Sequence, residues 1–223
     1  MLKPILFNTD MTRAVFDGRK TATRRIVKAP VLYSCTEPPS RIFRDGDLFQ
    51  FQWNTGKTIG GFSIKPPYLP GDILYVRETW STRLSNECYA QPCHGGICPY
   101  ESCESADGPC FPEEFIYKAS HSLPSSGGKW HPSIHMPKEA ARIFLRVTDV
   151  RVERLQEITD EGAKAEGANN GIGVADKMRE SAIQRFQKIW DSTIKPTVLS
   201  AYGWEANPYV WAVEFERCEK PEA

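Results

Sequence analysis

The clearest strand pattern in the chain is Ala141-Arg-Ile-Phe-Leu-Arg-Val-Thr-Asp-Val-Arg-Val-Glu153. Ile143, Leu145 and Val147 alternate with polar or outward residues, which is the two-residue period of a strand buried on one face. The alternation restarts after a break near Asp149, as it does at a β-bulge. The stretch therefore predicts one long strand that is interrupted close to its middle.

Shorter patterns surround this strand. Alternation and turn residues predict strands at 4–7, 73–80, 115–118 and 209–215. Helical spacing predicts helices at about 9–17, 159–166 and 175–192. Residues 29–70 are rich in Pro, Gly and aromatics, which predicts loops with short hairpins. Several short strands with few helices and no βαβ alternation indicate an α+β fold, a compact β-rich barrel with peripheral helices.

Length and charge limit the possible functions. The chain has 223 residues, which suits one domain with insertions. Lys+Arg and Asp+Glu both number 28, so the net charge of zero excludes a basic field over the whole protein. Any nucleic acid would have to be held by a local patch. No apolar run approaches the roughly 18–20 residues that cross a bilayer, and the first residues lack the features of a signal peptide. We therefore expect a cytoplasmic protein with no membrane partner.

A cationic segment, Gly18-Arg-Lys-Thr-Ala-Thr-Arg-Arg25, follows the first predicted helix. It holds four cations and two hydroxyls, namely Arg19, Lys20, Arg24 and Arg25 with Thr21 and Thr23. In an extended segment Lys20 and Arg24 share one face, while Thr23 and Arg25 share the other. In a turn, Lys20 and Thr23 can converge instead. Arginine forks match phosphate oxygens, so the segment suits a nucleotide, but the same composition also suits a surface ion-pair network.

The spacing Gly18-x-Lys20-x-x-Thr23-x-Arg25 resembles the signature of the ASCH domain family, which has a PUA-like fold. Later blocks resemble that family in the same order: Gly71-Asp72 before Val76-Arg-Glu-Thr-Trp80, then Ala165-Glu-Gly167, then Trp211-Ala-Val-Glu-Phe215. The whole layout, including residues 130–137, resembles a longer prophage-associated branch. The resemblance implies a single domain over residues 1–223. It would be a PUA-like small β-barrel with peripheral helices, with insertions at about 30–65 and 81–135, the second a Cys-rich loop.

The resemblance also implies a function. ASCH proteins bind RNA, nucleosides or nucleotides, and some are hydrolases: one type removes an acyl group from an acetylated cytidine, and another is a ribonuclease. At the positions of the first type's catalytic pattern, this chain has Lys20, Thr23 and Glu78. Thr23 would be the nucleophile and Lys20, if neutral, its base, with neighbouring arginines lowering the pKa of that lysine. Glu78 would be the general acid for the departing amine.

Other roles stay open for the same residues. Glu78 can be a salt-bridge partner of Arg77, Lys20 or Arg25, and the Thr23 hydroxyl can simply bind the ligand. The chain would then be a non-catalytic reader of RNA or nucleotides, and a phage-associated interaction factor is a further alternative. The expected ligand-binding residues are Arg19, Thr21, Arg24, Arg25, Arg77 and Trp80.

Five of the seven cysteines lie in one Pro- and Gly-rich stretch: Cys88, Cys93, Cys98, Cys103 and Cys110. The first four are separated by four residues each, and His94 lies among them. Four thiolates, or three with His94, would satisfy tetrahedral zinc, and such a closed site would be structural. Free thiols and disulfides are the alternatives, and the spacing does not select four ligands from the five cysteines.

Overall fold

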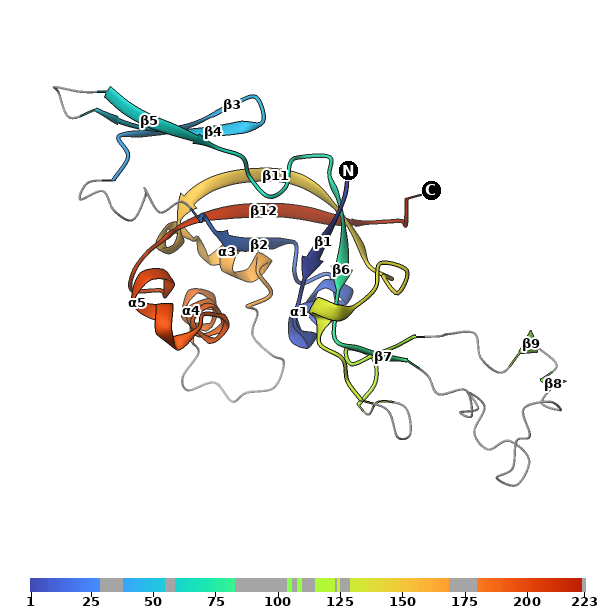
Figure 1. Cartoon of the computed structure of the whole chain (residues 1–223). Coiled ribbons are helices and arrows are strands. Elements are labelled where there is room, and N and C mark those ends of the chain that lie inside the picture. Colours follow the sequence, from blue (N-terminus) through green and yellow to red (C-terminus); the bar gives the residue numbers. More distant parts are fainter. Residues whose placement is uncertain are drawn as a thin grey trace. The chain divides into compact units, whose positions relative to one another are not determined.

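The computed structural model describes residues 1–28, 38–54, 59–82, 104–105, 108–109, 115–122, 124, 129–168 and 180–221. The chain divides into two compact units. The first comprises Met1–Lys3, Ala14–Leu74 and Phe144–Ala223, and the second comprises Pro4–Arg13 and Tyr75–Ile143. Both strands and helices are present, with strands predominating, so the predicted α+β class is confirmed (Figure 1). The single domain with two insertions stays a prediction.

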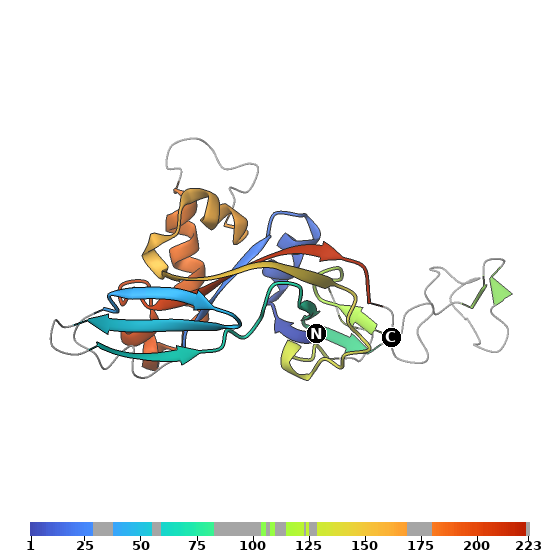
Figure 2. The same cartoon turned by 90° about the horizontal axis from the view of Figure 1, so that it is seen from above.

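The largest sheet has five strands in the order β1-β6-β11-β12-β2. These are β1 (Leu2–Leu6), β6 (Ile73–Arg77), β11 (Phe144–Arg154), β12 (Tyr209–Cys218) and β2 (Ala22–Ile26). Figures 1 and 2 show β11 and β12 as a long, curved pair, which is antiparallel with a register shift between Val147 and Asp149. The predicted break in this strand is therefore confirmed. A barrel requires the two edge strands to pair, but β1 and β2 remain edges, and no sheet closes within the described part of the chain.

A second sheet occupies part of the stretch that the sequence predicts as loops. It consists of β3 (Arg41–Asp45), β4 (Leu48–Asn54) and β5 (Ile59–Ile64), paired antiparallel in chain order. The rings of Phe49 and Phe51 from β4 are buried, and they meet Trp211 and Tyr209 of β12 edge-on at centroid distances of 5.1 and 6.2 Å. Alternate aromatic residues of β4 thus anchor this sheet on β12.

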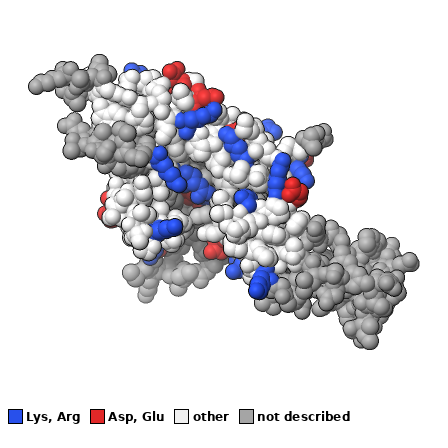
Figure 3. Space-filling model, viewed as in Figure 1, with Lys and Arg blue, Asp and Glu red and all other residues white. Residues whose placement is uncertain are grey.

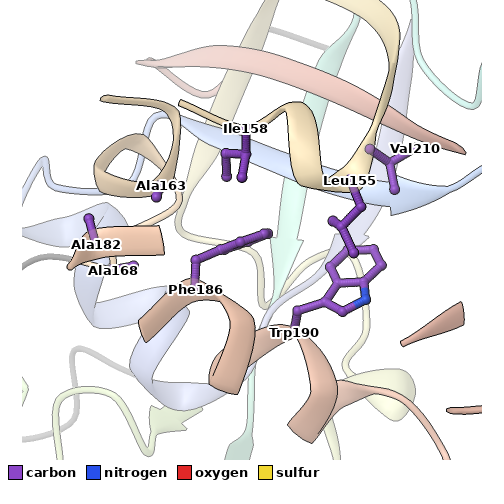
Figure 4. Packing of buried hydrophobic residues seen from close by; sticks show 8 residues of the cluster. All are labelled: Leu155, Ile158, Ala163, Ala168, Ala182, Phe186, Trp190 and Val210. Carbon is purple, nitrogen blue, oxygen red and sulfur yellow. The ribbon is translucent and has the colours of Figure 1, made fainter. Parts of the chain in front are cut away.

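Helices cover one face of the large sheet. Helix α3 (Asp160–Ala165) is capped by Thr159 and followed by Gly167, whose φ of 89° favours glycine. Helix α4 (Ala182–Thr193) begins with a capping box between Ser181 and Gln184, later than the predicted start near residue 175. Figure 4 shows their shared core, in which Phe186 and Trp190 of α4 pack with buried residues from α3, its flanks, the start of α4 and β12: Leu155, Ile158, Ala163, Ala168, Ala182 and Val210. The turns η4 (Leu155–Glu157) and η5 (Pro196–Val198) and helix α5 (Leu199–Tyr202) complete this part.

Short elements make up most of the second unit. Helix α1 (Thr9–Phe16) starts where predicted, because the Asn8 side chain accepts from the Met11 N–H at 2.8 Å. The predicted strand at 73–80 is interrupted after Arg77, and β7 (Trp80–Thr82) pairs with β10 (Phe115–Tyr117). The turn η3 (Ser133–His135) and the small pair β8 (Glu104–Ser105) and β9 (Gly108–Pro109) complete it. Among the described helices of the chain, none is long and apolar enough to span a bilayer.

Candidate functional site

The cationic segment is extended, as the first of the two sequence alternatives predicts. Gly18 ends α1 with a φ of 70°, and β2 then pairs with β12 so that Thr23 lies opposite Val213. Strand alternation places Lys20 and Arg24 on one face and Thr23 and Arg25 on the other. The contacts agree, since Lys20 and Arg24 both reach the carboxylate of Glu166, which follows α3.

Lys20 is completely enclosed, with a side chain that is 0% exposed. Its Nζ donates to a Glu166 carboxylate oxygen at 2.6 Å, to the Glu166 carbonyl at 3.0 Å and to the Ala22 carbonyl at 2.8 Å. Burial lowers the pKa of Lys20, Glu166 opposes that shift, and Arg25 and Arg24 add to it. An ammonium carries three N–H donors and a neutral amine only two, so these acceptors match the protonated form.

Arg24 extends this arrangement into a four-residue cluster, here named the Lys20 network: Lys20, Arg24, Glu153 and Glu166. The Arg24 guanidinium bonds Glu153 at 2.6 and 2.7 Å and lies 3.4 Å from Glu166. It also lies 5.8 Å from the Phe186 ring centroid, on the helical core of Figure 4. The network thus pairs two cations with two carboxylates, and Glu153 also accepts from the partly exposed Arg151 at 3.1 Å. Lys20, predicted to be catalytic, and Arg24, predicted to bind a ligand, are thus held by the protein's own carboxylates.

The opposite face of β2 carries a different set of groups. Thr23 is 2% exposed, and its hydroxyl makes no hydrogen bond to any residue that the structure describes. Arg25 is half-buried and lies close enough to Tyr68 to affect its titration. Burial raises the pKa of the Tyr68 phenol, and the positive charge of Arg25 partly opposes that rise. The Thr23 hydroxyl, which has no partner among the described residues, thus lies on the same face of β2 as the Arg25 guanidinium. The phenol of Tyr68 lies near that guanidinium.

Glu78 belongs to the second unit, in the turn between β6 and β7. Its carboxylate is 1% exposed and accepts two bonds from the fork of Arg142, at 2.9 and 3.0 Å. The Arg142 guanidinium lies 3.8 Å from the ring centroid of Tyr117, whose hydroxyl donates to the Ala140 carbonyl at 2.6 Å. Sequence reasoning proposed Arg77 as one partner for Glu78, but Arg77 donates to the carbonyls of Met136 and Ile134.

The remaining predicted ligand-binding residues are largely engaged by the protein itself. Arg19 is exposed and pairs with Asp17 at 2.6 Å. Thr21 is exposed, and its backbone bonds Ala165 and Phe215. Trp80 contacts Phe115 edge-on and lies tilted against His131, and its buried Nε1 has no partner within the described ranges.

The structure thus brings some predicted residues together and leaves one convergence untested. Lys20 joins Arg24, Thr23 shares a face with Arg25, and Glu78, Arg77 and Trp80 lie along one short segment. Lys20 and Thr23 belong to the first unit and Glu78 to the second, so the catalytic convergence of these three stays a prediction.

Three charged residues of these clusters have no assigned role in the sequence reasoning: Glu153, Glu166 and Arg142. Glu166 stands in the block Ala165-Glu-Gly167, whose likeness to a family block was its available signal. Glu153 is the last residue of the strand pattern at 141–153 and has the parity of its outward positions. Arg142 stands directly before Ile143, where the apolar alternation of that pattern starts. Nothing in their local spacing distinguishes them from surface charges.

The predicted zinc ligands Cys88, Cys93, Cys98, Cys103 and Cys110 lie outside the described residues, and the zinc site stays a prediction. In the ranges that the structure does describe, no group of three or more His, Cys, Asp or Glu residues is arranged to hold a metal. Cys218 is the free cysteine within those ranges, and burial raises the pKa of its thiol.

Comparison with known proteins adds no relative. No family model matches the chain, no curated protein matches it, and no solved structure matches it. The likeness to the ASCH family therefore rests on the ordered motifs of the sequence alone.

Proposed function

We propose that this chain binds a nucleoside, a nucleotide or RNA through the face of β2 that carries Thr23 and Arg25. The observation that carries the proposal is Thr23, a residue that is 2% exposed and whose hydroxyl makes no hydrogen bond within the described part of the chain, so that it is free to bond a ligand. A ligand oxygen or amide would satisfy it, and the Arg25 guanidinium could donate to a phosphate or carbonyl oxygen.

In this proposal the Lys20 network positions the strand and does not contact the ligand. Lys20 and Arg24 tie β2 to Glu166 after α3 and to Glu153 on β11. Because buried charge pairs hold one face of β2 in place, the side chains on its other face have little conformational freedom. Less conformational entropy is then lost when they bind a ligand.

We propose an ASCH-type, PUA-like arrangement for the fold, with β3–β5 and residues 81–135 as its insertions. The support is the order of the motif blocks along the sheet: the cationic segment leads into β2, Gly71-Asp72 precedes β6, and the Trp211 block lies in β12. A small ligand is favoured over long duplex nucleic acid, because duplex affinity depends on many phosphate contacts. The net charge is zero, and Figure 3 shows Lys and Arg in separate groups on the face drawn.

Hydrolysis of an acylated cytidine is the second candidate function, and the lowered pKa of Lys20 favours it. The Thr23 oxygen would attack the acyl carbon and lose its proton to Lys20. The carbon–nitrogen bond would then break as Glu78 protonates the departing amine, and water would hydrolyse the resulting ester. This mechanism would require Lys20 to leave its three acceptors and reach Thr23 on the opposite face of the strand, and Arg142 to withdraw from Glu78.

The test compares Thr23→Val, which removes the hydroxyl at nearly constant volume, with Thr23→Ser, which keeps it. Cytidine, acetylated cytidine and a short single-stranded RNA are titrated against the full chain by calorimetry, and acetate release is followed separately. Loss of one satisfied hydrogen bond should weaken binding about five- to ten-fold in Thr23→Val, while Thr23→Ser stays close to the unsubstituted protein. Equal binding by both variants would overturn the proposed face. Binding without acetate release would remove the hydrolase.

A further inference from the structure

A pocket of about 360 Å³ lies in the first unit, where the end of β2 meets the segment that follows α4. Its lining includes Ile26 and Lys28 from the β2 end, and Ile194, Lys195, Val198 and Tyr202 from beyond α4. Ile26 has the same strand parity as Arg24, so the pocket lies on the face of β2 that is opposite Thr23. It is therefore separate from the proposed nucleoside site.

The pocket's walls are mostly apolar and are fixed by the helical core. Ile26, Ile194 and Val198 supply aliphatic surface, and Tyr202 adds an aromatic ring. The wall is braced by the buried Trp190, whose Nε1 donates to the Tyr202 carbonyl at 2.8 Å and whose carbonyl accepts from Thr193 at 2.7 Å. Ligand sites of proteins are typically preformed, apolar hollows of about 300–1,000 Å³ with a few polar groups, and this pocket fits that description.

Two lysines set the charge of the pocket. Lys28 and Lys195 are exposed, and neither forms an ion pair with any residue in the described ranges. Other lysines of the first unit do have such partners: Lys164 pairs with Asp160 and Lys188 with Glu180. None of the described lining residues is acidic. Among the described residues, the pocket therefore combines an apolar interior with two lysines that have no acidic partner, which complements an anion carried on an apolar body.

We propose that this pocket binds an organic phosphate monoester with a compact apolar or aromatic body. The phosphate carries close to two negative charges at neutral pH, which matches the two ammonium groups of Lys28 and Lys195. The body lies against Ile26, Ile194 and Val198, with the Tyr202 ring as an additional surface. This second site is independent of the proposed function at Thr23.

Phenyl phosphate is the probe, titrated into the full chain and followed by calorimetry and by amide chemical shifts. We expect saturable binding that is at least about ten-fold tighter than that of inorganic phosphate or of phenol, because each of these lacks one half of the complementarity. Lys28→Gln and Lys195→Gln should each weaken binding about three- to ten-fold, and added salt should weaken it further. Both lysines are exposed, so the variants should fold normally.

Three controls separate this site from others. Lys138→Gln removes an exposed lysine of the second unit that does not line the pocket, and it should leave the affinity unchanged. Thr23→Val should also leave it unchanged, whatever the outcome at the nucleoside site. Val198→Asp places a negative charge in the partly exposed wall and should reduce affinity more than either lysine change. Equal binding of phenyl phosphate and inorganic phosphate, or full affinity in the double variant Lys28→Gln/Lys195→Gln, would overturn the proposal.

Discussion

The Lys20 network of the first unit and the Glu78–Arg142 pair of the second unit both enclose a predicted catalytic residue, but they are built differently. In the network the two cations and two carboxylates all have side chains that are at most 14% exposed. In the pair, Glu78 is equally enclosed, whereas the Arg142 side chain is 28% exposed. Lys20, Arg24 and Glu166 are at most 5% exposed, while Glu153 also bonds Arg151, whose side chain is 43% exposed. The pair reaches solvent directly through its own Arg142.

This difference separates two roles for buried charge. Replacing a sealed member strands its neighbours in a medium that solvates ions poorly, so the whole cluster acts as a structural unit. A carboxylate whose partner can exchange with water is easier to uncover, which is what a general acid or a ligand-binding group requires. We therefore expect the network to dominate stability and the pair to be the more adaptable of the two clusters.

The largest effect is expected for Glu166→Gln. The change keeps the shape of the side chain but removes the charge that compensates Lys20, and breaking a buried pair in this way costs about 3–5 kcal/mol. Urea unfolding of the full chain measures the loss. Adding Lys20→Met to this variant should recover part of the stability, because the stranded ammonium is then removed.

Lys164→Gln is the matched control for this prediction. It breaks an ion pair with Asp160 on the neighbouring helix α3, where both side chains are largely exposed. No measurable change in unfolding is expected. If Glu166→Gln were as stable as Lys164→Gln, the network would have no structural role and the contrast between the clusters would disappear.

A smaller effect is expected for Arg142→Met, about 1–3 kcal/mol by the same measurement, since hydrogen bonds to charged groups have this size. Glu78 loses both bonds of the guanidinium fork, but water can partly replace them through the exposed side. Arg142→Lys keeps the charge without the planar fork and the stacking on Tyr117. Its stability should fall between that of the unsubstituted chain and that of Arg142→Met. A loss in Arg142→Met that equals that of Glu166→Gln would show that the pair is as sealed as the network.

The two clusters also show how far the sequence can lead. Local signals predicted a helix from about residue 9 and the break near Asp149, and both are confirmed. The cationic segment adopts the extended one of the two geometries that the sequence left open. These features depend on neighbours along the chain, because caps, turns and strand alternation are short-range properties.

The ion-pair partners of Arg24 and Glu78 could not be predicted from such short-range signals. Glu153 meets Arg24 across 129 positions, and Arg142 meets Glu78 across 64. Such pairings are fixed by sheet order and by the packing of α3, and one sequence contains no record of either. Residues 29–70 were predicted as loops with short hairpins, and β3–β5 form such hairpins. Their anchoring on β12 by alternate buried aromatics had no local signal in the sequence.

The smallest loss of stability is expected at a third ion cluster, around Asp72. There the test is whether the charge of Asp72 or its hydrogen bonds stabilise the fold. Asp72 accepts from Lys3 at 2.6 Å and from the Leu69 N–H at 2.8 Å, and the terminal amine lies 3.3 Å away. Burial acts to raise the pKa of Asp72, but these partners outweigh it and lower the pKa below its usual value of 3.8.

A lowered carboxyl pKa contributes stability that is complete above the unfolded value and is lost as the pH falls through the folded one. Asp72→Asn should therefore be less stable than the unsubstituted chain at pH 7, and this difference in stability should narrow as the pH falls below 3.8. Urea unfolding at pH 7, 4 and 3 measures it, with the exposed Asp17→Asn as control. Asparagine at this position can still accept a hydrogen bond from the Leu69 N–H. A difference in stability that stays constant with pH would therefore mean that side-chain geometry and hydrogen bonding, not charge, link Asp72 to its neighbours.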